Sequence, residues 1–92
     1  RGGHSHRTLE EVVFCLSGSF EIVVDDGRRR QTFLLDDPRI GLHLPPLVWQ
    51  DMRGFESGTV YAVLASAAYD EDDYIRDYDR FLAAVGAARA PA

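Results

Sequence analysis

Turn-forming residues divide the first two thirds of the chain into short runs, and this rhythm limits the folds that are open to it. The turns fall at 26–27, 36–38, 45–46 and 56–58, where Gly, Pro, Asp and Ser gather. Between them the chain is rich in β-branched and aromatic residues, and in 20–25 the apolar residues Phe20, Ile22 and Val24 alternate with other residues. Short strands with turns about every 8–12 residues predict an antiparallel sandwich or barrel.

Roughly seven strands are expected, followed by one helix. The strands are expected at 1–6, 11–17, 20–25, 30–35, 41–45, 48–53 and 59–66. After residue 66 the apolar residues are three or four positions apart, which predicts an amphipathic helix over about 70–88. We therefore expect an all-β fold in a single domain, 1–92, with strands over about 1–66 and a C-terminal α-helix that packs on the outside.

The charge balance argues against broad binding to nucleic acids or membrane surfaces. The net charge is −5, and all ten basic residues are Arg. Acidic residues concentrate between 70 and 79, and we interpret that run as a solvated face. A small anionic ligand is still compatible with the sequence, because Arg1, Arg7 or Arg53 could hold it locally.

The single cysteine excludes a disulfide within the chain and a zinc site built from cysteines. Cys15 stands in an apolar run, 12–16, so we expect a buried structural thiol. No apolar run is long enough to span a membrane, and no signal peptide is visible. The sequence therefore predicts a cytoplasmic protein.

Two of the three histidines lie in the first expected strand with one residue between them. Side chains alternate across a strand, so His4 and His6 should face the same space. An imidazole titrates near neutral pH and has two distinct nitrogens, which suits proton transfer or metal binding. The pair is therefore the leading candidate for a functional site.

The spacing of His4, His6, Glu11 and Gly18 resembles the first motif of the cupin superfamily, whose members fold as a small antiparallel jelly-roll barrel. In metal-binding cupins, two His and a Glu of this motif bind a metal together with a His of a second motif. The second-motif position here resembles Gln50, and Gln is a poor ligand for transition metals. The resemblance thus implies at most three protein ligands.

A closer resemblance covers nearly the whole chain and is to the sugar-nucleotide 3,4-ketoisomerase family. It rests on residues 1–7, 15–21, 25–27, 35–38, 44–46 with Trp49, 64–66 and 69–82, of which the last is the most distinctive. Members of this family are metal-independent cupins acting on dTDP-4-keto-6-deoxyglucose in deoxysugar and polysaccharide biosynthesis. The resemblance implies an isomerase that forms the 3-keto sugar and needs no cofactor.

The resemblance also implies roles for particular residues. His4 and His6 are expected to be the acid–base pair, and the sequence leaves open which of them removes the proton. Arg1 and Arg7 match basic residues beside the family's site, and Arg1 could stabilise enediolate or phosphate charge. Apart from the resemblance, Trp49, Gln50 and Arg53 are further substrate-binding candidates, and Trp49 could instead be a core or pocket-wall aromatic.

The sequence leaves the oligomeric state and two other functions open. Family members have about forty more residues before this point, which supply strands and a dimer-forming edge, so we expect a homodimer with exposed edges paired. The rival functions are a metal-dependent cupin that uses His4, His6 and Glu11, and a non-catalytic sugar-binding module. Tyr74 and Tyr78 are interpreted as helix-packing residues.

Overall fold

The computed structural model describes residues 2–89, which form eight strands, one short 3₁₀ helix and one α-helix. In chain order these are β1 (Gly2–His6), β2 (Glu11–Ser17), β3 (Phe20–Asp25), β4 (Arg30–Leu35), β5 (Gly41–Leu44), β6 (Trp49–Arg53), β7 (Val60–Ala65), η1 (Glu71–Asp73), β8 (Tyr74–Ile75) and α1 (Tyr78–Arg89). Every expected strand is present with bounds close to those predicted.

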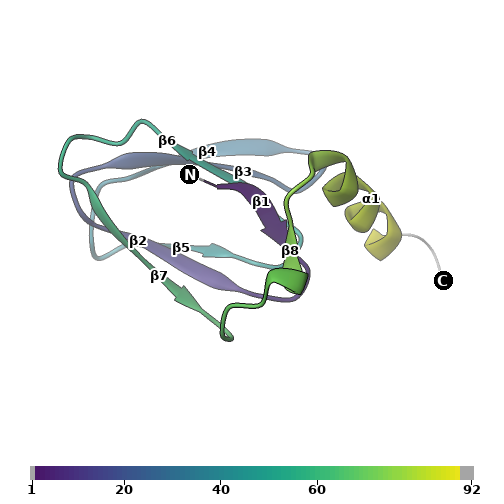
Figure 1. Ribbon diagram of the computed structural model, residues 1–92. Coiled ribbons are helices and arrows are strands. Elements are labelled where there is room, and N and C mark those ends of the chain that lie inside the picture. Colours follow the sequence, from purple (N-terminus) through teal and green to yellow (C-terminus); the bar gives the residue numbers. More distant parts are fainter. Residues whose placement is uncertain (1, 90–92) are drawn as a thin grey trace.

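The strands form two antiparallel sheets that face each other (Figure 1). The larger sheet has the order β4-β3-β6-β1-β8, and the smaller has the order β5-β2-β7. The predicted all-β fold with a C-terminal helix is confirmed. Since no strand of one sheet pairs with a strand of the other among the described residues, the fold is a two-sheet sandwich rather than a closed barrel.

The main core lies between the two sheets. Its buried residues come from four strands and are Val13, Cys15, Phe20, Ile22, Leu35 and Leu44. Phe20 and Ile22 are fully buried, as the alternation in β3 predicts. Cys15 is a buried free thiol, so the prediction of a structural cysteine is confirmed.

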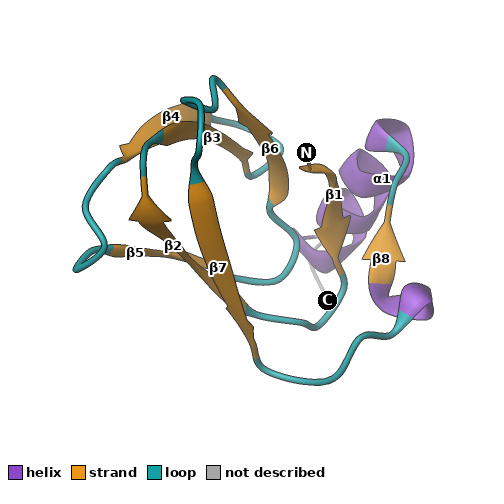
Figure 2. Cartoon of the chain, turned by 60° about the vertical axis from the view of Figure 1, so that its left-hand side comes forward, coloured by secondary structure: helices purple, strands orange, loops and turns teal. Residues whose placement is uncertain are grey.

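A second core lies under α1, on the outer side of the larger sheet. It contains Trp49, Ile75, Phe81 and Val85. Figure 2 shows β1 between β6 and β8, with α1 behind them. Within residues 2–89, neither helix is long and apolar enough to cross a membrane.

The predicted start of the helix at about residue 70 is wrong, because α1 begins at Tyr78. The Asp73 carboxylate accepts hydrogen bonds from the backbone N–H groups of Thr8 and Leu9, which ties this segment to the turn after β1. Tyr74 and Ile75 then pair with β1 as a short strand. These long-range contacts override the helical spacing of the apolar residues, and the predicted helix forms only from Tyr78 onward.

Candidate active site

The histidine pair lies on β1, between β6 and the edge strand β8 of the larger sheet. His4 is opposite Gln50 of β6, and His6 is opposite Tyr74 of β8. The two imidazole rings contact edge to face, with centroids 5.0 Å apart and an interplanar angle of 79°. The expectation that both rings face the same space agrees with this geometry.

Glu11 and Gln50 place polar atoms beside the pair. The Gln50 side-chain amide donates to Glu11 Oε1 at 3.0 Å, and His6 Nδ1 lies 3.9 Å from the same oxygen. His6 and Gln50 are only 4% and 2% exposed. Burying polar groups lowers folding stability unless they have hydrogen-bond partners. A buried polar cluster in so small a domain therefore points to a role other than stability.

The same residues include three potential metal ligands. One donor atom from each of His4, His6 and Glu11 can be chosen so that all lie within 4.8 Å of one another. Gln50 directs its N–H group toward the Glu11 carboxylate, so in this arrangement it adds a donor to the carboxylate. The set offers two imidazoles and a carboxylate, ligand types that bind transition metals, and so fits a site with three protein ligands.

Tyr74 forms a wall against both histidines. Its ring centroid lies 4.4 Å from that of His6 and 5.1 Å from that of His4. The interpretation of Tyr74 as a helix-packing residue assumed that 70–77 is helical, and β8 replaces that helix. The strand-like alternation of Tyr74, Ile75 and Arg76 is the sequence signal that could have revealed this position, since Ile75 alone is directed into the core under α1.

A hollow of about 350 Å³, called here the histidine hollow, opens beside His4. The hollow is lined by His4, Glu11, Gln50, Met52, Tyr61, Val63, Tyr74 and Arg76. His4 borders it, whereas His6 is buried beside Tyr74 and its Nε2 has no hydrogen-bond partner among the described residues. One imidazole, a carboxylate and an amide thus line space for a small polar molecule, and the second imidazole contacts the first.

The other predicted substrate-binding residues fall in different places. Arg7 lines a neighbouring hollow with Arg76 and Arg80. Arg53 is exposed and pairs with Glu21, with Nε 3.3 Å from Oε1, and does not line the histidine hollow. The predicted role of Arg1 lies outside the described residues.

Trp49 points away from the histidines and belongs to the core under α1, not to the candidate site. It neighbours Gln50 on β6, so the two side chains face opposite sides of the sheet. The indole packs on Tyr78 and Phe81, with ring centroids 5.3 and 5.6 Å away, and donates to Asp51. The alternative of a core aromatic is the one that the structure supports.

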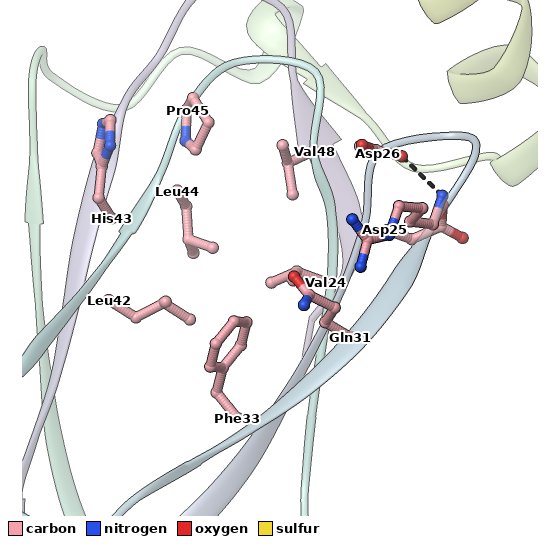
Figure 3. A pocket seen from close by; sticks show the side chains of 11 residues that line it. Val24, Asp25, Asp26, Gln31, Phe33, Leu42, His43, Leu44, Pro45 and Val48 are labelled. Carbon is pink, nitrogen blue, oxygen red and sulfur yellow. Dashed lines mark hydrogen bonds between the residues drawn. The ribbon is translucent and has the colours of Figure 1, made fainter.

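A second hollow, of about 250 Å³, opens between β4 and β5 (Figure 3). Its walls are mostly apolar side chains, including Val24, Phe33, Leu42 and Leu44. His43 borders it and is hydrogen-bonded to Glu10 at 2.8 Å. This hollow has no second imidazole beside His43 and is a poorer candidate for proton transfer than the histidine hollow.

Comparisons with known proteins agree with the family resemblance seen in the sequence. The family model described as "FdtA: WxcM-like, C-terminal" matches residues 1–86. A TDP-4-oxo-6-deoxy-alpha-D-glucose-3,4-oxoisomerase from Aneurinibacillus thermoaerophilus is 51% identical over 81 residues, which are 88% of this chain and 58% of that protein.

Solved structures of 3,4-ketoisomerases share the fold. A variant of QdtA from Thermoanaerobacterium thermosaccharolyticum, in complex with TDP-4-keto-6-deoxyglucose, is 41% identical with a TM-score of 0.94; the match covers 99% of this chain and 66% of QdtA. A 3,4-ketoisomerase from Helicobacter canadensis is 46% identical with a TM-score of 0.90, over 94% of this chain and 65% of that one. The chain thus spans slightly less than two thirds of the length of these relatives.

Proposed function

This chain belongs to the FdtA (WxcM-like, C-terminal) family, and we propose that it is an isomerase that converts a dTDP-4-keto-6-deoxyhexose into its 3-keto isomer. The observation that carries the proposal is the contact between His4 and His6 beside a hollow that also receives Glu11 and Gln50. The substrate class comes from the names of the similar proteins.

The reaction needs proton transfers and no change in composition. The 4-keto group acidifies the hydrogen on sugar carbon 3, and a base removes that proton while the carbonyl oxygen gains one. The resulting enediol then takes a proton at carbon 4 and loses the proton of its carbon 3 hydroxyl. Two imidazoles with ring centroids 5.0 Å apart suit this chemistry, because groups that titrate near neutral pH both accept and donate protons efficiently.

The surroundings give the two histidines different positions in this reaction. His4 borders the hollow and can reach a sugar there. His6 is buried, and its Nδ1 lies 3.9 Å from Glu11 Oε1, so the carboxylate is close enough to orient its ring. We propose that the pair shares the proton transfers, with Glu11 and Gln50 fixing the polar end of the hollow.

We further propose a homodimer that works in the cytoplasm in deoxysugar or polysaccharide biosynthesis, with a nucleotide sugar as its partner molecule. Support for the dimer comes from the outer strands β4 and β7, which expose Leu34, Val60 and Leu64. Apolar edge strands pair readily with another chain unless they are covered. Sedimentation of the protein with its natural N-terminus should give twice the monomer mass.

Exchange of the carbon 3 hydrogen tests the function. In deuterated water, the protein with its natural N-terminus should replace that hydrogen of dTDP-4-keto-6-deoxyglucose with deuterium, as followed by proton NMR. Treatment with a chelator should leave the exchange rate unchanged. A folded protein that produces no exchange above the solvent background would refute the proposal.

A second candidate is a metal-dependent cupin enzyme, which the proximity of His4, His6 and Glu11 favours. It predicts stoichiometric bound metal that is lost in His6→Ala, measured by elemental analysis. It also predicts that chelation abolishes the exchange. Both results together would replace the metal-independent mechanism.

A further inference from the structure

An arginine on the rim of the histidine hollow is held in place by an exposed carboxylate. Arg76 donates from Nε to Glu71 Oε2 at 2.9 Å and from a terminal nitrogen to Oε1 at 2.8 Å. The Tyr69 hydroxyl donates to the same carboxylate. The two parallel bonds make this a geometrically specific pair, which favours one orientation of the guanidinium.

Arg76 in turn contacts the wall of the site. Its guanidinium carbon lies 4.2 Å from the centre of the Tyr74 ring, and the Tyr69 ring packs on Tyr74 with centroids 5.4 Å apart. Tyr74 also contacts both imidazoles. A continuous series of contacts therefore leads from Glu71 through Arg76 and Tyr74 to the histidine pair.

A similar fork elsewhere shows what is particular to this one. Asp37 and Arg39 make the same two-bond arrangement, at 3.0 and 2.9 Å, in the connection between β4 and β5. Both forks are exposed, and exposed ion pairs contribute little to folding stability. Of the two arginines, Arg76 is the one that stacks on an aromatic ring beside His4 and His6.

We propose that Glu71 and Arg76 are positioning residues that hold the Tyr74 ring against the histidine pair and so fix the orientation of both imidazoles. Arginine suits this role because its planar guanidinium can stack on a ring while its edge binds a carboxylate. The ion pair also stays charged at neutral pH, since hydrogen bonds from Arg76 and Tyr69 lower the pKa of Glu71 to about 2.

The test replaces the charge of Glu71 without changing its shape. Glu71→Gln should move the ring-proton resonances of His4 and His6 in NMR spectra, because the Tyr74 ring current depends on where that ring lies. Arg76→Met should do the same, and Asp37→Asn is the matched control that should not. Unfolding temperatures should stay close to that of the wild type in all three.

The prediction for kcat and KM rests on the proposed function, and it is tested independently of the NMR measurement. Glu71 does not line the hollow, so Glu71→Gln should lower kcat by about tenfold while KM changes little, as misplacement of a reacting group does. If the resonances move but the wild type shows no exchange, the proposed function fails and the positioning role stands. Unmoved histidine resonances in Glu71→Gln and Arg76→Met, or an equal movement in Asp37→Asn, would overturn the inference.

Discussion

The two faces of the larger sheet bury different kinds of residue, and neighbouring positions of β6 show the contrast. Gln50 faces the space between the sheets, where it bonds to Glu11 beside the histidines. Trp49 faces α1 and packs on Phe81 and Tyr78. At β6, therefore, one face places an amide beside the histidine hollow, while the other packs an aromatic ring under α1. The candidate site and the anchoring of the helix therefore use opposite faces of the same strand.

The largest expected effect is on activity, from the polar face. His4→Gln should lower the carbon 3 exchange rate by about 10²–10⁴-fold, because a positioned acid–base group contributes about that much. His4 is only partly buried, so the free energy of unfolding should change little. Exchange followed by NMR, together with urea unfolding, checks both parts. An exchange rate that stays near the wild-type value would contradict the role of the pair.

The second largest expected effect is a loss of folding stability on substitution in the core under α1. Phe81 is fully buried under α1, and Phe81→Ala should lower the free energy of unfolding by about 3–5 kcal/mol. Leu82→Ala, at the next and partly exposed position of the same helix, is the matched control and should cost far less. Urea unfolding monitored by circular dichroism measures both. Equal losses in the two variants would show that the cluster under α1 is not a distinct core.

Asp25 links the helix face to β3 and should make the anchoring depend on pH. Burial alone would raise its pKa, but hydrogen bonds from Tyr78, the Gly27 amide and Arg30 lower it overall. A lowered pKa means that the charged form stabilises the fold above the ordinary pKa and that this contribution is lost as the pH falls through the folded value. Stability should therefore fall below about pH 4.

Asp25→Asn should remove about 1–3 kcal/mol near neutral pH, because it weakens a buried hydrogen-bonded charge. It should also flatten the acid limb of the stability profile, measured by urea unfolding between pH 3 and pH 7. Asp36→Asn, at an exposed carboxylate, serves as the comparison. A wild-type profile that is already flat in this range would contradict the linkage.

A smaller and more specific effect is expected from the amide in the site. Gln50→His would place an imidazole opposite His4 and beside Glu11, so the site could offer four ligands instead of three. Divalent metal should then bind more tightly than to the wild type, as measured by calorimetry. Equal metal affinity in the two proteins would show that Gln50 does not determine the metal preference of this site.

Sequence reasoning found most strands because alternation and turn residues are local signals. It placed His4 and His6 together for the same reason, since residues two apart in a strand share a face. It missed Tyr74 because the tie between Asp73 and the backbone of Thr8 and Leu9 joins residues more than sixty positions apart. It also left the direction of Trp49 open, because Trp49 and Gln50 are both buried although they lie on opposite faces of β6.

The family resemblance supplied what alternation cannot. Nothing in the spacing of two histidines distinguishes proton transfer from metal binding, and in the structure the same donors lie close enough for either. The substrate class in the proposal comes from the names of the similar proteins. The structure adds the arrangement of Glu11, Gln50 and Tyr74 around the pair.

The central claim is that the His4 and His6 pair moves a proton on a nucleotide-linked keto sugar without metal. Its most direct test is deuterium exchange at carbon 3 of dTDP-4-keto-6-deoxyglucose, followed by NMR, on chelator-treated protein with its natural N-terminus. The account predicts rapid exchange by the wild type and exchange near background in the folded double variant His4→Ala, His6→Ala. Exchange that survives in the double variant, or that disappears from the wild type on chelation, would contradict it.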